Sequence, residues 1–200
     1  MNYRAVSTRC AVDFATLNLS ITEEAALEIL NSAGFHVVSV DISAEARAMV
    51  GKSAYKRGAQ ITEAPHVVDC SSLTKWVYGR CGIWLPRRSI QQFEFGRRVD
   101  DEERMEGDLI FTSGYRDYYP DDSSLRIGHV GMVTSEMTVI HAASRLRGVV
   151  EEELALFLQR QKIQAVCRFL GSGNTLVLET PERRHVETAD DIRWIILQRL

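Results

Sequence analysis

The chain changes from helical to strand-like periodicity at Gly107, and this change limits the folds open to it. Before that glycine, apolar residues at helical spacing predict helices over Ser71 to Tyr78 and Ser89 to Phe95. After it come three short β-prone runs separated by turn residues: Asp108 to Phe111, His129 to Thr134 and Thr138 to Ala142. Helices followed by an antiparallel meander indicate an α+β domain, with a helical half packed on a central antiparallel sheet.

Weaker patterns predict the remaining elements. Ser20 and Glu23 have capping-box spacing for a first helix that Gly34 ends. The other expected elements are a strand over Phe35 to Ile42, a Ser43-capped helix to Gly51, a helix over Glu151 to Gln159, strands over Gln164 to Leu170 and Thr175 to Thr180, and a helix over Asp190 to Leu200. We therefore divide the chain into an N-terminal α/β extension (1–42), a main domain (43–170) and a C-terminal strand-helix extension (171–200).

The composition matches an ordinary soluble domain. The chain has 200 residues, of which 45% are hydrophobic and 26% charged, which argues against a disordered chain and a membrane protein. The formal net charge of -3 gives no reason to expect nucleic acid or an anionic membrane as a partner. No apolar stretch suits a secretory signal, so we expect a cytoplasmic protein, or one released by lysis, a phage particle or dedicated secretion. Oligomeric state is not encoded in these patterns.

The four cysteines are too scattered for a disulfide framework, and no two form the close pair of a zinc site. Burial as small hydrophobic residues explains Cys10, Cys81 and Cys167. We expect no metal and no organic cofactor. The long polar loop from Ser113 to Ile127, rich in Tyr and Asp, suits either a functional or a merely mobile insertion.

Cys70 differs from the other cysteines because it stands at the first turn of a predicted helix. Unpaired backbone N–H groups and the positive end of the helix dipole favour a thiolate there. Its own backbone N–H is placed to meet an oxyanion. Cys70 is therefore the candidate nucleophile.

Two histidines supply candidate partners for that thiol. His129 stands in a β-run between Gly128 and Gly131, where we expect room for a bulky ligand, and His141 lies on the next predicted strand. One imidazole would accept the thiol proton, and the second would orient the first. One cysteine and two histidines alone are more often core residues than a catalytic site.

Several ordered motifs raise that expectation. Asp69-Cys70-Ser71 at a helix start, Gly128-His129-Val130-Gly131 on a strand and His141 on the next strand resemble the NlpC/P60 family of papain-like cysteine peptidases. Further matches are Tyr55-Lys56-Arg57-Gly58, Leu85-Pro86-Arg87 and Gly107-Asp108-Leu109. The resemblance covers roughly residues 43–170.

The resemblance implies a papain-like NlpC/P60 fold and a cysteine endopeptidase or amidase. Cys70 would be the nucleophile, His129 the base and His141 its orienter, with Tyr55 near the oxyanion. Asp69, Ser71 and Ser89 would bind the amine and diamino-acid groups of the substrate. The implied substrate is peptidoglycan or a murein-derived peptide, typically cut between D-glutamate and a diamino acid.

Structural roles also suit these residues: Asp69 and Ser71 as a helix cap, Ser89 as the N-cap of the next helix, and Tyr55 as a half-buried aromatic. The sequence departs from the family pattern at Ala59, Val68 and Ser72, each where a glycine is usual. We expect a narrower or differently shaped pocket wall as a result.

Two other functions fit the same fold. An acyltransferase or amide-forming enzyme would resolve the thioester with an amine or alcohol instead of water. A non-catalytic binding or toxin-like effector module would keep Cys70 inert, which slow thiol alkylation would reveal.

Overall fold

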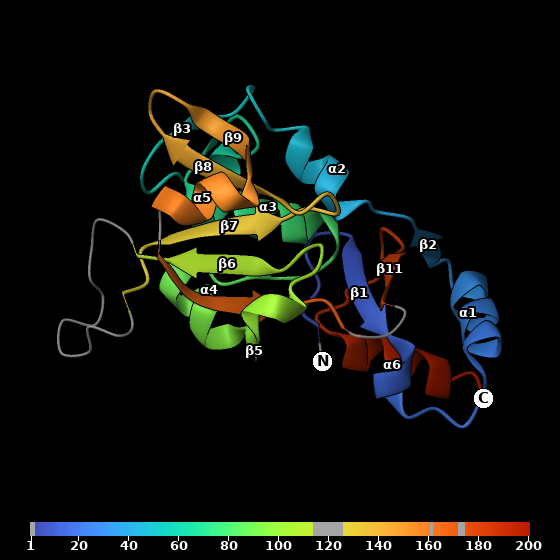
Figure 1. Cartoon of the computed structure of the whole chain (residues 1–200). Helices are drawn as coiled ribbons and strands as arrows, with labels where there is room; N and C mark the ends of the chain where they lie inside the picture. The colour runs from blue at the N-terminus through green and yellow to red at the C-terminus, as the bar shows by residue number, and fades with distance from the viewer. Residues whose placement is uncertain (1–2, 114–125, 161, 172–174) are drawn as a thin grey trace. The chain divides into compact units, whose positions relative to one another are not determined.

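A computed structural model of the chain describes residues 3–113, 126–160, 162–171 and 175–200, which group into two compact units (Figure 1). The larger unit comprises residues 41–77 and 85–170, and the smaller comprises residues 1–40, 78–84 and 171–200. Most of the tyrosine- and aspartate-rich loop predicted from Ser113 to Ile127 lies outside the described residues.

The larger unit is built on a six-stranded sheet of order β5-β10-β6-β7-β8-β9, in which all neighbouring strands are antiparallel. Its strands are β5 (Arg97–Val99), β6 (Leu109–Thr112), β7 (His129–Val133), β8 (Thr138–Ser144), β9 (Gly148–Glu153) and β10 (Ile163–Arg168). The meander expected from the periodicity after Gly107 is the part β6-β7-β8, and β9 extends it.

Helices and a short strand pair complete this unit. They are α2 (Ile42–Arg47), α3 (Cys70–Arg80, which continues into residues of the smaller unit), α4 (Ser89–Phe95), α5 (Leu154–Arg160), and the parallel strands β3 (Ala54–Tyr55) and β4 (Val67–Val68). Two single turns of 3-10 helix, η2 (Ile61–Glu63) and η3 (Asp101–Glu103), lie between them. The α4 bounds agree with the prediction, and α2 starts after Asp41, whose side chain accepts from the Ala44 N–H, so Ser43 is not the cap.

The helix predicted over Glu151 to Gln159 is wrong in its first turn. Residues 148–153 form β9 along β8, and the helix α5 starts only at Leu154. The three glutamates favour a helix locally, but strand pairing satisfies their backbone groups and buries Val149 on one face and Glu152 on the other. Strand pairing therefore overrides the local helix preference and places Glu152 on a strand next to β8.

A buried ion pair joins the residue just before β6 to the last residue of β10. Arg168 donates from Nε and Nη2 to the two carboxylate oxygens of Asp108, at 2.8 and 2.7 Å, and the exposed fractions of the two residues are 8% and 1%. Such paired geometry compensates for the removal of two charges from water. The aspartate of the Gly-Asp-Leu motif therefore has a structural role, because its ion pair ties the start of β6 to β10.

Gly131 allows close packing between β7 and β8. A Cβ atom at this position would lie 2.5 Å from Val139 Cγ1 and 3.4 Å from His141 Cβ. The glycine was expected to leave room for a bulky ligand, but the space beside it is filled by Val139. The missing side chain lets β7 and β8 pair here without a clash with Val139.

The smaller unit contains a three-stranded antiparallel sheet of order β1-β11-β2, built from Arg9–Asp13, Thr175–Glu179 and His36–Val38. Its helices are η1 (Phe14–Leu17), α1 (Glu23–Ser32) and α6 (Ala189–Leu197), and apolar side chains from all three enter one core. The cap of α1 is Thr22 rather than Ser20, and β2 is shorter than the strand predicted over Phe35 to Ile42.

The two terminal extensions, predicted as separate segments, therefore share one sheet in which β11 lies between β1 and β2. The predicted domain division itself stays a prediction. Over the part of the chain that the structure describes, no helix has the length and apolar character needed to cross a membrane.

We predict that Gly131→Ala lowers the free energy of unfolding by about 1–3 kcal/mol, because the new methyl group overlaps Val139. Urea unfolding should show this cost in the wild-type background and a clearly smaller cost in a Val139→Ala background, where the overlapping Cγ1 is gone. Equal costs in both backgrounds would contradict the close β7-β8 contact.

Candidate active site

Cys70 is the first residue of α3, and Asp69 caps that helix. The Ser72 backbone N–H donates to Asp69 Oδ1 at 2.8 Å, and the Asp69 backbone N–H donates to Ser72 Oγ at 2.8 Å. This reciprocal pair satisfies donors that a helix start leaves unpaired and fixes the backbone on both sides of Cys70. Ser72, which stands where the family pattern has glycine, therefore closes the cap.

Asp69 is also the centre of a buried polar cluster. Its carboxylate accepts from Arg87 Nη1 at 3.0 Å and Nη2 at 2.7 Å, from the Gly58 N–H at 2.9 Å and from Ser71 Oγ at 3.3 Å. Gly58 has a φ of +74°, a conformation that favours glycine, so the Tyr-x-x-Gly segment turns there toward Asp69. Burial acts to raise the pKa of Asp69, but hydrogen bonds from Arg87 and Ser72 outweigh it and lower that pKa.

The two histidines meet across neighbouring strands. His129 Nε2 lies 2.8 Å from His141 Nδ1, and the two rings are nearly perpendicular at 82°. Met132 pairs with Ile140 and Val133 with Val139, so His129 and His141 are diagonal neighbours on one face of the sheet. Phe157 of α5 packs against both rings, with centroid distances of 6.4 Å to His129 and 5.0 Å to His141.

The sulfur of Cys70 lies beside the strand that carries His129. Burial raises the pKa of the Cys70 thiol to about 11, and the Asp69 carboxylate acts in the same direction. Hydrogen bonds from the backbone amides of Val130 and Ser71 oppose this rise. Val130 follows His129 directly, so the Cys70 sulfur lies next to the part of β7 that carries His129.

Tyr55 belongs to the same neighbourhood. It pairs with Val68 in the short parallel strands, two residues before Cys70. Burial raises the pKa of the Tyr55 hydroxyl, and the nearby Cys70 and Asp69 raise it further. Tyr55 therefore keeps its proton at neutral pH and is a hydrogen-bond donor close to the sulfur.

Both imidazoles are neutral at physiological pH. Burial lowers the pKa of His129, and proximity to His141 lowers it further. Burial also lowers the pKa of His141, against the opposing effect of Glu152. Burial acts against the thiolate that the helix start was expected to favour, and these pKa shifts indicate a thiol beside a neutral imidazole as the resting pair.

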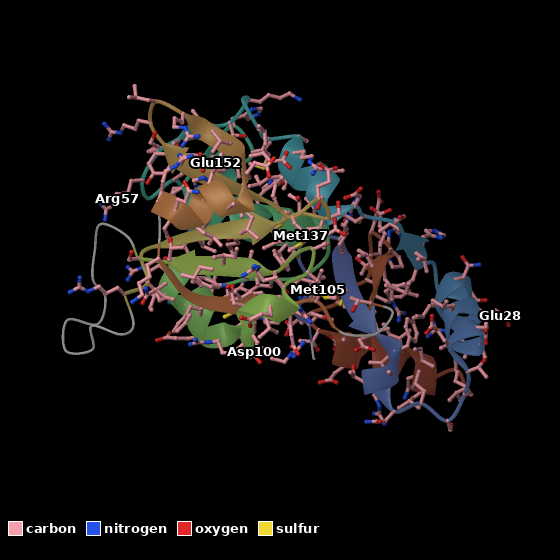
Figure 2. All side chains as sticks on the ribbon, viewed as in Figure 1. Glu28, Arg57, Asp100, Met105, Met137 and Glu152 are labelled. Atoms are coloured by element: carbon pink, nitrogen blue, oxygen red, sulfur yellow. The ribbon has the colours of Figure 1, made fainter. Side chains whose placement is uncertain are left out.

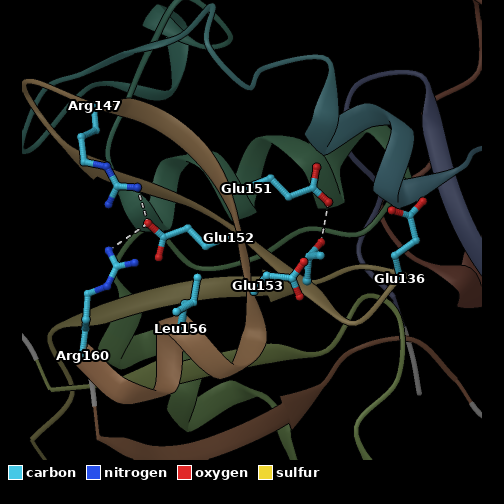
Figure 3. Close-up of a pocket in the computed structure, with 8 residues that line it drawn as sticks. Glu136, Arg147, Glu151, Glu152, Glu153, Leu156 and Arg160 are labelled. Atoms are coloured by element: carbon cyan, nitrogen blue, oxygen red, sulfur yellow. Dashed lines mark hydrogen bonds and ion pairs between the residues drawn. The ribbon is translucent and has the colours of Figure 1, made fainter.

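A third charged residue joins this group. Glu152 lies on β9 (Figure 2). It is 9% exposed, and its Oε2 lies 3.7 Å from His141 Nε2. His141 pairs with Val150, so Glu152 is its diagonal neighbour, as His129 is on the other side. Figure 3 shows Arg147 and Arg160 pointing at the Glu152 carboxylate from two directions.

Glu152 was not predicted as a site residue, because its strand was assigned to a helix. On a helix, residue 152 has no fixed relation to His141. The signal that could have found it is the period-2 spacing of Val150 and Glu152, which is typical of a strand. This spacing points to His141 only once the pairing of β9 with β8 is known, in which Val150 faces His141 and Glu152 faces Val139.

The match to known proteins follows this geometry. The model of the NlpC/P60 family matches residues 51–168, more than half of the chain. The chain belongs to the NlpC/P60 family. That range contains Tyr55, Cys70, His129, His141 and Glu152.

Individual relatives agree with the family match. The chain is 35% identical over 101 residues to the probable endopeptidase p60 of Listeria monocytogenes, which covers 50% of this chain and 18% of that protein. It is 35% identical over 81 residues to the γ-D-glutamyl-L-lysine dipeptidyl-peptidase of Bacillus cereus, covering 40% and 22%. The chain thus spans less than a quarter of these relatives.

A solved structure confirms the fold class. NlpC2 from Trichomonas vaginalis aligns with a TM-score of 0.54 and 22% identity, over 66% of this chain and 46% of that one. Together with the family match, this confirms the predicted α+β, papain-like NlpC/P60 fold.

The substrate-binding roles of Asp69, Ser71 and Ser89 stay predictions. All three side chains are largely buried, with exposed fractions of 7%, 5% and 6%. Ser71 Oγ accepts from Arg87 Nη1 at 3.0 Å, and Ser89 is the first residue of α4 rather than its cap. The helix-cap role is observed for Asp69.

The other sequence departures and cysteines are structural. Ala59 is buried and its carbonyl accepts from Arg87, while buried Val68 belongs to β4. Cys10, Cys81 and Cys167 are buried, which confirms the packing prediction. Among the described residues, no three His, Cys, Asp or Glu side chains are grouped to hold a metal ion.

We predict that Arg87→Met destabilises the protein by about 2 kcal/mol at pH 7, since it leaves the buried Asp69 carboxylate without its cation. The value is below that of a fully buried pair because the Arg87 side chain is 33% exposed. Arg88→Met, an exposed neighbouring position, is the matched control and should be nearly neutral.

The sign of the pH dependence follows from the lowered pKa of Asp69. The stabilisation is complete above the unfolded-state pKa of about 3.9 and is lost as the pH falls through the lower folded-state pKa. The deficit of Arg87→Met should therefore shrink in acid. A deficit that is constant from pH 7 to pH 3 would contradict the pairing.

Proposed function

We propose that the protein hydrolyses an amide bond in peptidoglycan-type peptides, with Cys70 as nucleophile and His129 as base. The observation that carries this proposal is the 2.8 Å contact between His129 Nε2 and His141 Nδ1, on a strand whose next amide reaches the Cys70 sulfur. The membership in the NlpC/P60 family and its relatives named as endopeptidases support it.

The first chemical step follows from which ring nitrogen is free. His129 Nε2 is engaged by His141, so Nδ1 is the nitrogen left to accept the Cys70 proton. As the proton moves to Nδ1, the sulfur attacks the substrate carbonyl, and the imidazolium that forms donates from Nε2 to His141 Nδ1. His129 then gives the proton to the leaving amine, which produces a thioester on Cys70.

Water completes the cycle. His129 Nδ1 takes a proton from water, the hydroxide attacks the thioester carbonyl, and Cys70 leaves as the thiol once its proton is returned. The negative oxygen of both tetrahedral intermediates needs donors. The Cys70 backbone N–H at the start of α3 and the protonated Tyr55 hydroxyl are our candidates.

For the scissile bond, we propose the γ-D-glutamyl linkage to a diamino acid. The name of the Bacillus cereus relative states this linkage with L-lysine. Asp69 and Ser71 remain the proposed contacts to the substrate amine, although Arg87 already occupies both side chains. An amine would therefore share the Asp69 carboxylate with Arg87.

We expect Cys70→Ala to lower kcat by ~10³-fold or more, because no other group forms the thioester. The assay digests purified cell-wall sacculi and free wall peptides and reads the products by mass spectrometry. Cys81→Ala, a buried cysteine outside the site, is the matched control and should keep full activity. Cleavage that persists in Cys70→Ala would overturn the mechanism.

The pH profile tests the lowered pKa of the base. His129 must be unprotonated to act as base, and its lowered pKa means that it stays unprotonated into acid. We therefore expect the acid limb of kcat/KM to lie below the value of about 6.5 for an ordinary histidine. An acid limb at or above that value would show that burial does not control the base.

A further inference from the structure

A row of buried polar groups crosses three strands of the sheet and continues beyond the expected triad. His129 on β7, His141 on β8 and Glu152 on β9 are successive diagonal neighbours on one face. His129 Nε2 is 2.8 Å from His141 Nδ1, and His141 Nε2 is 3.7 Å from Glu152 Oε2. His141 thus presents Nδ1 to His129 and Nε2 to Glu152.

The proposed reaction determines which nitrogen of His141 carries the proton. His129 Nδ1 must be bare in the resting enzyme to accept the Cys70 proton, so His129 carries its hydrogen on Nε2. That hydrogen points at His141 Nδ1, which must therefore be an acceptor. A neutral His141 then has its only hydrogen on Nε2, facing Glu152.

An orienting acceptor is needed at that nitrogen. His141 is 3% exposed, and within the described part of the chain its Nε2 is buried without a hydrogen-bond partner. At 3.7 Å, Glu152 Oε2 is beyond ordinary hydrogen-bond length but close enough for its charge to attract the N–H. An ionised carboxylate only accepts hydrogen bonds, so it selects the tautomer with hydrogen on Nε2.

The surroundings of Glu152 keep it ionised. Arg147 donates to its Oε1, and Arg160 Nη1 does so at 3.2 Å. Burial acts to raise the pKa of Glu152, but the hydrogen bond from Arg147 and the nearby charges hold it below its usual range. The charged or titratable groups that face His141 are thus His129, Glu152, Arg147 and Arg160.

We propose that Glu152 is a positioning residue that holds His141 in the Nε2–H tautomer, so that His141 Nδ1 accepts from His129 and leaves His129 Nδ1 bare for Cys70. Across the His141 ring, the carboxylate also stabilises the positive charge that His129 gains during attack. The catalytic purpose of this arrangement rests on the proposed function, but the His141 tautomer is a property of the resting protein and can be measured without substrate.

The first test needs no substrate. Nitrogen-15 spectra of the labelled protein at pH 7 distinguish protonated from bare ring nitrogens, and His141→Gln identifies the His141 signals. We expect His141 to be protonated on Nε2 and His129 to be protonated on Nε2. Protonation of His141 on Nδ1 would overturn the proposal, whatever the enzyme cleaves.

The second test removes the charge and keeps the shape. In Glu152→Gln, the side-chain amide can donate as well as accept, so we expect both His141 tautomers in the spectrum. On wall peptides, kcat should fall roughly 10- to 100-fold while KM changes less than about twofold, since Glu152 does not touch substrate. Glu153→Gln, the exposed neighbour on the same strand, is the matched control and should change neither readout.

The third test separates positioning from a merely structural role. In a His141→Ala background, Glu152→Gln should cause no further loss of kcat, because Glu152 acts through His141. An equal loss in both backgrounds would overturn the proposal, and so would a Glu152→Gln protein with wild-type tautomer and kcat. If no wall peptide is cleaved at all, the proposed function fails, and the tautomer measurements still decide the role of Glu152.

Discussion

The hydrogen bond between His129 Nε2 and His141 Nδ1 depends on the register of two strands, and the site depends on that bond. A shift of one residue between β7 and β8 would turn one of the histidines to the opposite face of the sheet. Gly131 permits the close approach of the strands, and Phe157 supports both rings. The sheet is therefore the part of the fold that defines which nitrogen faces Cys70.

Charge is kept at the two ends of the site, and its centre is neutral. At one end, the Asp69-Arg87 pair fixes the start of α3, which carries Cys70. At the other end, Glu152 lies next to His141 and is paired with Arg147 and Arg160. Between them, burial favours the thiol of Cys70 and neutral imidazoles. The Cys70 thiol and the His129 imidazole are then both uncharged in the resting protein, so the thiolate forms only as the proton moves to His129.

Local signals predicted the triad candidates but not their support. The helix start at Cys70 and the β-runs of His129 and His141 follow from cap residues and periodicity, which are short-range properties. Arg87 meets Asp69 only through the turn before α4, and Glu152 meets His141 only through strand pairing. A run of three glutamates before Leu154 favours a helix locally, so its place in β9 could not be read from spacing.

The central claim is that Cys70 forms a thioester with the acyl part of a wall peptide, and the most direct measurement is the mass of the protein during turnover. A reaction with a γ-D-glutamyl-diamino acid peptide, quenched in acid and analysed by intact-protein and peptide mass spectrometry, should show one acyl adduct, located on Cys70. Cleavage of the peptide without any adduct on Cys70, or with an adduct on another residue, would contradict the account.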